Sequence, residues 1–432
     1  MRPLVYHAGL YAASAAFLKA AGFVFFLWLA RTLSVGEYAA WGLLYALQTW
    51  VTSFASVGIL EAVIGLLKSH ATKESQQKLF TAANGCFVVT LACAVLAVGM
   101  FAAAIEDTKV LIAPLVFAIA SGAILAHASL QAQMVRLEER HIESIYLNFL
   151  IPMSGLIGSL AAFTVQRTVP SFFLGSTVGL TLSLAAAMAK GIGFYGLPNG
   201  IAALRPILYR ITPFIAVTSL GWLGGYGNTY IMELLFHSQE VAQFTFVFMI
   251  SSAMQLIASS TNQVWSPRFY RLIRTAPLDQ VEMQSQRFFL WQGLVLGVAG
   301  ALIVGLFPLA IDFVGGNLVH YQSLGRELLL LTIAYAVIGP YWHCQNHFLV
   351  HDKGGLIMKV HVIAGVLGLT LLAVLLWILG PLGIYVGFLA QMALRSATAL
   401  FVAKQTWPLT ISWAGMIVGT VLPVGAFFAS AH

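Results

Sequence analysis

The chain has 432 residues, of which 59% are hydrophobic and 9% are charged, and its mean hydropathy is +0.87. A soluble domain carries about 25% charged residues, so this composition excludes a soluble globular protein and indicates a polytopic membrane protein. The formal net charge is +7, but in a membrane protein the positions of the charges matter more than their sum. Cys86, Cys93 and Cys344 lie in apolar runs, which predicts neither a disulfide framework nor a metal site.

Long apolar runs recur along the whole chain, and each can cross a hydrocarbon layer of about 30 Å. The first twelve predict transmembrane helices over residues 8–30, 39–67, 81–105, 110–135, 145–165, 169–189, 211–235, 241–265, 288–314, 328–350, 354–379 and 382–403. The first run is too long for a signal peptide, and we expect it to be retained. A thirteenth run covers residues 411–430, and the sequence leaves open whether it spans the membrane.

Lysine and arginine are distributed unequally between alternate loops. If the N-terminus is cytoplasmic, fifteen lie on the cytoplasmic side: Arg2, Lys68, Lys73, Lys78, Arg136, Arg140, Lys190, Arg205, Arg210, Arg268, Arg271, Arg274, Arg287, Lys353 and Lys404. Four lie on the external side: Arg31, Lys109, Arg167 and Arg326. Because cytoplasmic loops carry the excess of basic residues, this distribution predicts a cytoplasmic N-terminus.

The loop lengths predict the domain organisation. External connections are short, whereas a long cytoplasmic connection follows the sixth run and contains Pro198, Gly200 and Pro206. We predict an all-α polytopic membrane protein with two six-helix bundles around a central cavity. The N-terminal bundle covers residues 1–189, the cytoplasmic linker 190–210, the C-terminal bundle 211–404, and a last hydrophobic segment 405–432.

Several features expected of enzymes are absent from the sequence. It contains no G-x-x-x-x-G-K-[ST] motif, no Asp-x-Asp and no large external loop. We therefore expect a protein that is not an enzyme, with no cofactor, no metal and no nucleic-acid partner.

Lys19 is the twelfth residue of the first apolar run, which puts its ammonium near mid-membrane unless the side chain snorkels. Glu61 lies in the second run, and neighbouring helices of one hairpin can bring the two side chains together. One interpretation is a structural ion pair, or Glu61 at the headgroup level. The other is that Lys19 holds an anionic substrate, with Glu61 tuning the cation or carrying a coupling proton.

Arg395 lies nine residues before Lys404, hence about 13 Å from the cytoplasmic face and near the depth of Lys19. Gln391 lies one turn away on the same helix face. Two cations at this depth suit a phosphate group, because arginine binds phosphate through two parallel hydrogen bonds and lysine acts as a point charge. The alternative is that Arg395 snorkels to the inner interface.

His343, His347 and His351 recur at intervals of four residues, so they share one helix face. Such a stripe can relay protons, line a polar cavity, bind a metal or simply form a polar helix face. We take His343 and His347, together with Glu61, as candidates for ion coupling. Asn228 and Gln255 carry amides, which can bind sugar hydroxyl groups, and glycines near residue 224 allow close packing or local unwinding.

Three short segments carry a family resemblance. Residues 26–38, FLWLARTLSVGEY, resemble the first-loop signature of the polysaccharide transporter family, which includes the Wzx-type O-unit flippases. Residues 130–140, LQAQMVRLEER, resemble the exit of helix four in that family. Residues 238–268, from SQEVAQFTF to SPR, resemble its helix-eight segment.

The resemblance implies a flippase that moves undecaprenyl-pyrophosphate-linked oligosaccharide, such as an O-unit or exopolysaccharide repeat, across a bacterial inner membrane. The same superfamily contains multidrug exporters and lipid II flippases, whose two lobes alternate access to a central cavity. For such a substrate, the candidate substrate-binding residues are Lys19, Arg31, Arg395, Gln391, Asn228 and Gln255. The expected partners are the lipid-linked glycan, membrane lipids, a polysaccharide polymerase and a chain-length regulator.

The sequence leaves two alternative functions open. A drug or organic-cation antiporter of the same superfamily needs membrane-embedded carboxylates, whereas the deep charges here are mainly cations. A glycan polymerase or ligase needs a long external catalytic loop, which this sequence lacks.

Overall fold

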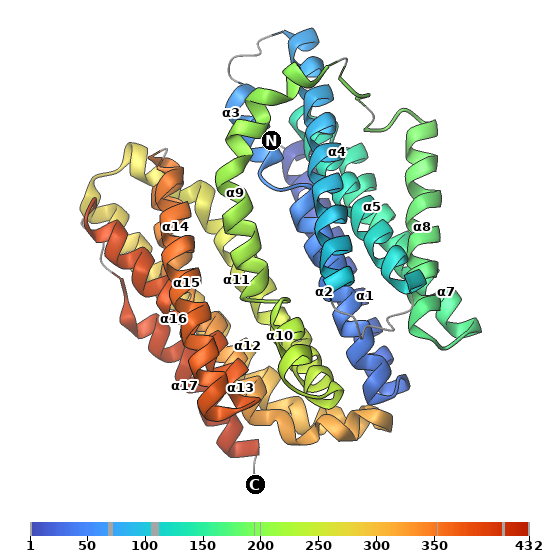
Figure 1. Cartoon of the computed structure of the whole chain (residues 1–432). Helices are drawn as coiled ribbons and strands as arrows, with labels where there is room; N and C mark the ends of the chain where they lie inside the picture. Colours follow the sequence, from blue (N-terminus) through green and yellow to red (C-terminus); the bar gives the residue numbers. More distant parts are fainter. Residues whose placement is uncertain are drawn as a thin grey trace. The chain divides into compact units, whose positions relative to one another are not determined.

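The computed structural model describes residues 2–67, 72–104, 112–193, 195–198, 200–351, 353–407 and 411–430. Within these residues all regular secondary structure is helical (Figure 1). Twelve helices or helix pairs there are long and apolar enough to cross a membrane, and α1 (Arg2–Thr32) precedes them. The predicted all-α polytopic fold is therefore confirmed.

The chain divides into two compact units, Met1–Trp28 with Ala40–Ser219, and Leu29–Ala39 with Leu220–His432. The turn after α1 thus belongs with the second unit. Residues 190–210, which the sequence predicts to be a linker between two bundles, lie within the first unit. Their role as a linker remains a prediction.

The first unit is built mainly from α1 to α9. Their bounds are α1, α2 (Val35–Ala55), α3 (Ile59–Leu67), α4 (Lys73–Ala104), α5 (Ile112–Leu137), α6 (His141–Ile145), the π-helix η1 (Tyr146–Leu150), α7 (Ile151–Val165), α8 (Val169–Ala189), the 3₁₀-helix η2 (Ile201–Leu204) and α9 (Arg205–Leu223). Helix α9 crosses the division, and its last four residues belong to the second unit.

The second unit contains α10 to α17. Their bounds are α10 (Asn228–Leu235), α11 (Ser238–Thr275), α12 (Leu278–Val314), the 3₁₀-helix η3 (Gly316–Leu324), α13 (Gly325–Val337), α14 (Gly339–Val350), α15 (Gly354–Leu379), α16 (Leu382–Lys404) and α17 (Trp413–Ser430). Helices α15 and α16 form a hairpin that turns at Gly380, whose φ of 60° favours glycine.

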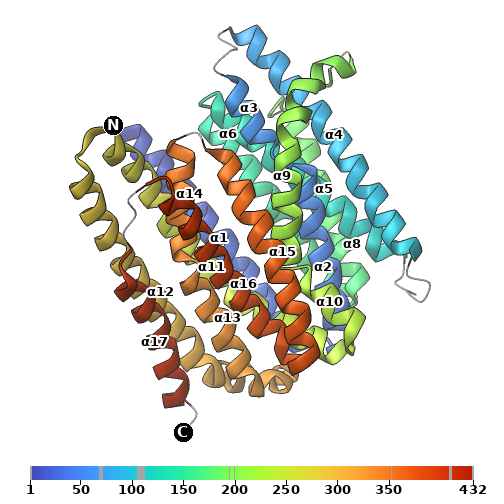
Figure 2. The same cartoon turned by 60° about the vertical axis from the view of Figure 1, so that its left-hand side comes forward.

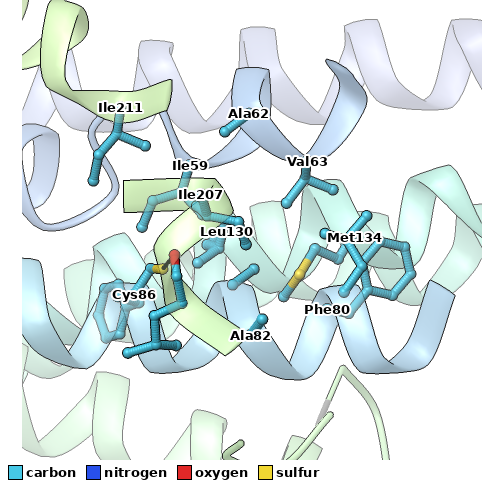
Figure 3. Close-up of a cluster of buried hydrophobic side chains, with 14 of the residues drawn as sticks. Ile59, Ala62, Val63, Phe80, Ala82, Cys86, Leu130, Met134, Ile207 and Ile211 are labelled. Carbon is cyan, nitrogen blue, oxygen red and sulfur yellow. Dashed lines mark hydrogen bonds between the residues drawn. The ribbon is translucent and has the colours of Figure 1, made fainter. Parts of the chain in front are cut away.

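A hydrophobic cluster holds α3, α4, α5 and α9 together in the first unit (Figure 3). It includes Ile59, Phe80, Met134 and Ile211, one from each helix. The cluster also covers the end of α2, where the hydroxyl of Thr90 donates to the carbonyl of Ala55 at 2.6 Å. A carbonyl freed by the end of a helix is therefore satisfied inside the apolar core.

Three apolar runs that were predicted as continuous helices are interrupted. The run 39–67 breaks at Ser56–Gly58, where Gly58 has a φ of 60° and a side chain would meet Phe214 at 2.8 Å. The run 211–235 breaks at residues 224–227, and the run 328–350 breaks at Ile338, before Pro340. Glycine adopts backbone conformations that end a helix, and proline lacks the N–H group that a continuous helix needs, so both residue types favour a break at these points.

The predicted cytoplasmic loop between residues 265 and 288 is also corrected. Helix α11 continues to Thr275 and α12 begins at Leu278, so only two residues connect them. Arg268, Arg271 and Arg274 thus lie on a helix that extends beyond the apolar run.

Helix α17 packs along α12 through small residues on both helices (Figure 2). A side chain at Gly297 would meet the carbonyl of Val418 at 2.7 Å, and one at Gly300 would meet Pro423 at 2.8 Å. Both residue numbers rise together along the seam, so the two helices run in the same direction. Small residues allow this close approach in a membrane, and α17 has the length and composition of a spanning helix.

Candidate functional site

Arg395 is partly buried on α16, within the second unit, and its place is fixed by the break between α13 and α14. Because the backbone N–H of Tyr341 bonds to Ile338 at 3.0 Å, the carbonyl of Val337 is free of its usual helical partner. The hydroxyl of Ser396 donates to that carbonyl at 2.8 Å. The guanidinium carbon of Arg395 then lies 5.8 Å from the centre of the Tyr341 ring, within cation–π range.

Tyr341 also contacts His361 on α15, and both side chains are buried. The Tyr341 hydroxyl lies 3.3 Å from Nε2 of His361, and Nδ1 of His361 lies 2.9 Å from the carbonyl of Ile357. A carbonyl only accepts, so Nδ1 must carry a proton. In the neutral ring Nε2 is then the acceptor, and Tyr341 donates to it. The three side chains form what we call the Arg395 cluster: Arg395, Tyr341 and His361.

The positive charge of this cluster is not balanced by a nearby acid. Among the described residues no carboxylate forms an ion pair with Arg395, and its buried Nε has no hydrogen-bond acceptor there. A partly buried guanidinium with an unpaired N–H group is costly, and an anion that accepts hydrogen bonds from it reduces that cost. The cluster can therefore bind a phosphate-like group.

Gln391 lies one turn before Arg395 and is buried between α15 and the break in the run 211–235. A side chain at Gly368 of α15 would meet Gln391 at 2.7 Å, and one at Gly224 would overlap its amide. Asn228, also buried, donates to the carbonyl of Gly224 at 3.4 Å. The structure thus brings Gln391 and Asn228 together around Gly224, where the sequence predicted either close packing or local unwinding. Both occur there.

The histidine stripe faces a different part of the second unit. His343 and His347 are buried, with their rings 5.1 and 4.7 Å from the ring of Phe269. His351 is exposed and stacks on Trp407. Positions 341 and 343 are about 200° apart on a helix, so the stripe points away from the Arg395 cluster. The described residues contain no group of three or more His, Cys, Asp or Glu side chains arranged to hold a metal ion.

Lys19 and Glu61 are both exposed in the first unit. The ion pairs between described residues do not include one between them, so the proposed structural pair is not formed. Lys19 and Arg395 belong to different units. Gln255 is exposed on α11, whereas its neighbour Met254 is buried.

The first-loop segment with the family resemblance has a clear structural role in the second unit. The Glu37 N–H donates to the Ser34 hydroxyl at 3.3 Å, and the Ser34 N–H donates to the Glu37 carboxylate at 3.0 Å, which makes a capping box at the start of α2. Tyr38 is buried against the rings of Phe246 and Tyr321. Exposed Arg31 lies against Gly316 of η3, where a side chain would meet it at 2.8 Å.

Sequence reasoning did not connect Tyr341 and His361 with Arg395. A usable signal existed, since His361 lies eight residues after Lys353 and Arg395 nine residues before Lys404. At 1.5 Å per residue both are about 12–13 Å from the predicted cytoplasmic ends of two helices joined by a tight turn.

Comparison with solved structures identifies similar folds. The lipid II flippase MurJ in its inward closed conformation has a TM-score of 0.76 and 12% identity, covering 97% of this chain and 92% of that chain. An inward-facing multidrug resistance MATE family transporter of the MOP superfamily has a TM-score of 0.64 and 12% identity, covering 90% and 94%. The eukaryotic MATE transporter AtDTX14 has a TM-score of 0.56 and 12% identity, covering 99% and 98%.

This chain has the fold of MurJ and the MATE transporters. At 12% identity the likeness concerns the fold, and it extends over nearly the whole of each chain. No protein-family model matches the sequence, and no curated protein matches it.

Proposed function

We propose that this protein is a flippase that moves undecaprenyl-pyrophosphate-linked oligosaccharide across the bacterial inner membrane by alternating access, driven by an ion gradient. The observation that carries the proposal is the guanidinium of Arg395, which no acid neutralises among the described residues. A pyrophosphate group supplies the missing negative charge and suitable acceptors. The fold shared with the lipid II flippase MurJ supports the same function class.

Each predicted residue has a role in this proposal. Arg395 binds the pyrophosphate through paired hydrogen bonds, and Lys19 contributes a second positive charge. The amides of Gln391, Asn228 and Gln255 offer partners for polar groups of the substrate, and Arg31 contributes charge near the external end. Glu61, His343 and His347 are the proposed ion-coupling groups. The N-terminus is cytoplasmic, and a polysaccharide polymerase and a chain-length regulator are the proposed protein partners.

An organic-cation antiporter is the second candidate, and the likeness to the multidrug MATE transporter favours it. Its substrate requires a carboxylate in the membrane, for which exposed Glu61 is available. A cation that reaches the Arg395 cluster would be repelled, so we rank this function second.

Transfer of a fluorescent undecaprenyl-pyrophosphate oligosaccharide across proteoliposomes tests the proposal. We expect transfer by the wild type, a loss of at least about tenfold in Arg395→Ala, and partial activity in Arg395→Lys, which keeps the charge but not the paired hydrogen bonds. Lys404 is an exposed cation at the end of the same helix, and Lys404→Ala serves as the matched control. Efflux of an organic cation without lipid transfer would favour the antiporter instead.

A further inference from the structure

The Arg395 cluster joins a fixed positive charge to a group that can take up a proton. His361 is held by the bond from Nδ1 to Ile357 at 2.9 Å, so a second proton can enter only at Nε2. That nitrogen lies 3.3 Å from the Tyr341 hydroxyl, and the Arg395 guanidinium lies over the face of the Tyr341 ring. One tyrosine therefore touches both the fixed cation and the protonation site.

We propose that His361 binds a proton together with the anion at Arg395, and that Tyr341 is the positioning residue between them. The inference rests on the proposed function, because the anion is the pyrophosphate group of that substrate. It names His361 as a group that links anion binding to proton binding.

The charges around His361 determine the direction of the coupling. The groups facing it in the described chain are Arg395 on α16 and Tyr341 on α14, with Cys344 next to Tyr341. From the end of α9, apolar Leu220 packs on α15 at Gly365, one turn beyond His361. On α15 itself Lys359 is exposed. No described carboxylate faces His361, so the charge of Arg395 opposes its protonation.

An anion at Arg395 cancels that repulsion. Proton binding at His361 then becomes more favourable, and by linkage a protonated His361 strengthens anion binding by the same factor. When Nε2 is protonated, the Tyr341 hydroxyl rotates from donor to acceptor and keeps its hydrogen bond. The cluster can therefore switch without a backbone movement.

Proton uptake on anion binding tests this directly. Farnesyl pyrophosphate is titrated into the full chain in detergent by calorimetry at one pH, in two buffers of different ionisation enthalpy. We expect the wild type to take up more protons per anion than His361→Gln, by at most about one, since a single site is linked. Changes in protonation of the probe itself are common to both proteins and cancel. His320→Gln, an exposed histidine on η3, is the control and should match the wild type.

Tyr341→Phe provides a second variant if His361→Gln does not fold. It keeps the ring under Arg395 and removes the hydroxyl, so it should still bind the probe but with a proton uptake different from that of the wild type. Equal uptake by the wild type, His361→Gln and Tyr341→Phe, with binding retained, would overturn the inference and leave the flippase proposal intact. A wild type that binds no pyrophosphate at any pH would overturn both.

Discussion

Arg395 lies over the face of Tyr341, with its guanidinium carbon 5.8 Å from the centre of the ring. This contact holds a membrane-embedded cation in place without neutralising it. An aromatic face lowers the cost of burial by about 0.5–2 kcal/mol while leaving the N–H groups free for a ligand.

Replacing the ring should therefore weaken anion binding. We expect Tyr341→Leu to reduce the affinity for farnesyl pyrophosphate by about 2- to 30-fold, the equivalent of 0.5–2 kcal/mol, because Arg395 must then be ordered when the anion binds. Tyr341→Phe keeps the aromatic ring, so its affinity for farnesyl pyrophosphate should fall much less. Calorimetric titration at fixed pH compares the two variants, and equal affinities would show that the ring has no positioning role.

The close seam between α12 and α17 should contribute to stability. Gly415 faces the backbone of α12, so Gly415→Leu should force the helices apart and cost about 1–3 kcal/mol, seen as a lower thermal midpoint in detergent. Gly425→Leu is the matched control on the same helix, because no atom of the described residues beyond its own helix backbone lies within 4 Å of a Cβ at that position. If Gly415→Leu and Gly425→Leu lower the thermal midpoint equally, the close contact between α12 and α17 does not contribute specifically to stability.

The length of α17 and its direction along α12 predict that it crosses the membrane. Gln405 and Ser430 should then lie on opposite sides. In a background without Cys86, Cys93 and Cys344, an impermeant maleimide added outside should label Ser430→Cys and spare Gln405→Cys. Labelling of both positions, or of Gln405→Cys alone, would contradict a spanning α17 or the predicted orientation.

The capping box at the start of α2 should be worth a measurable part of the stability. Ser34→Ala leaves an N–H group of α2 without its side-chain acceptor, and we expect a loss of about 0.5–2 kcal/mol. Ser34→Thr keeps the hydroxyl and should stay close to the wild type. Chemical unfolding in detergent separates the two outcomes.

Tyr195, outside the membrane-spanning segments, should make the first unit sensitive to alkali. Burial, and then its 2.8 Å hydrogen bond to Glu138, raise the pKa of Tyr195 above its ordinary value of 10.0. A raised folded-state pKa means that the stabilisation is complete below pH 10 and decreases as the pH rises above it. The thermal midpoint should therefore fall above pH 10, and this fall should be smaller in Tyr195→Phe.

The carboxylate that accepts from Tyr195, Glu138, also accepts a hydrogen bond from Arg140. The Arg140 guanidinium donates hydrogen bonds to the carboxylates of Glu143 and Glu138, and the bond to Glu143 raises the pKa of the arginine. Arg140 therefore keeps its charge throughout the alkaline range, and it should not account for the loss of stability.

The sequence by itself determined the fold class and the positions of nearly all the helices. A bilayer requires long apolar segments whose backbone hydrogen bonds are satisfied within each helix, so composition and run length are sufficient for that prediction. It also determined which charged residues were unusual, because Arg395 and Lys19 stand out in any apolar run.

Only the tertiary structure decided what surrounds each of these side chains. Phe214 packs at the break at Gly58, Gln391 packs at Gly224, and Ser396 donates to the carbonyl of Val337 beside Ile338, and all three lie far from these breaks in the sequence. The pairing of Tyr341 with His361 and Arg395 has the same origin, since three helices must pack before the side chains meet. Hydropathy records how deep a residue lies but not which way it points, and a binding site depends on both.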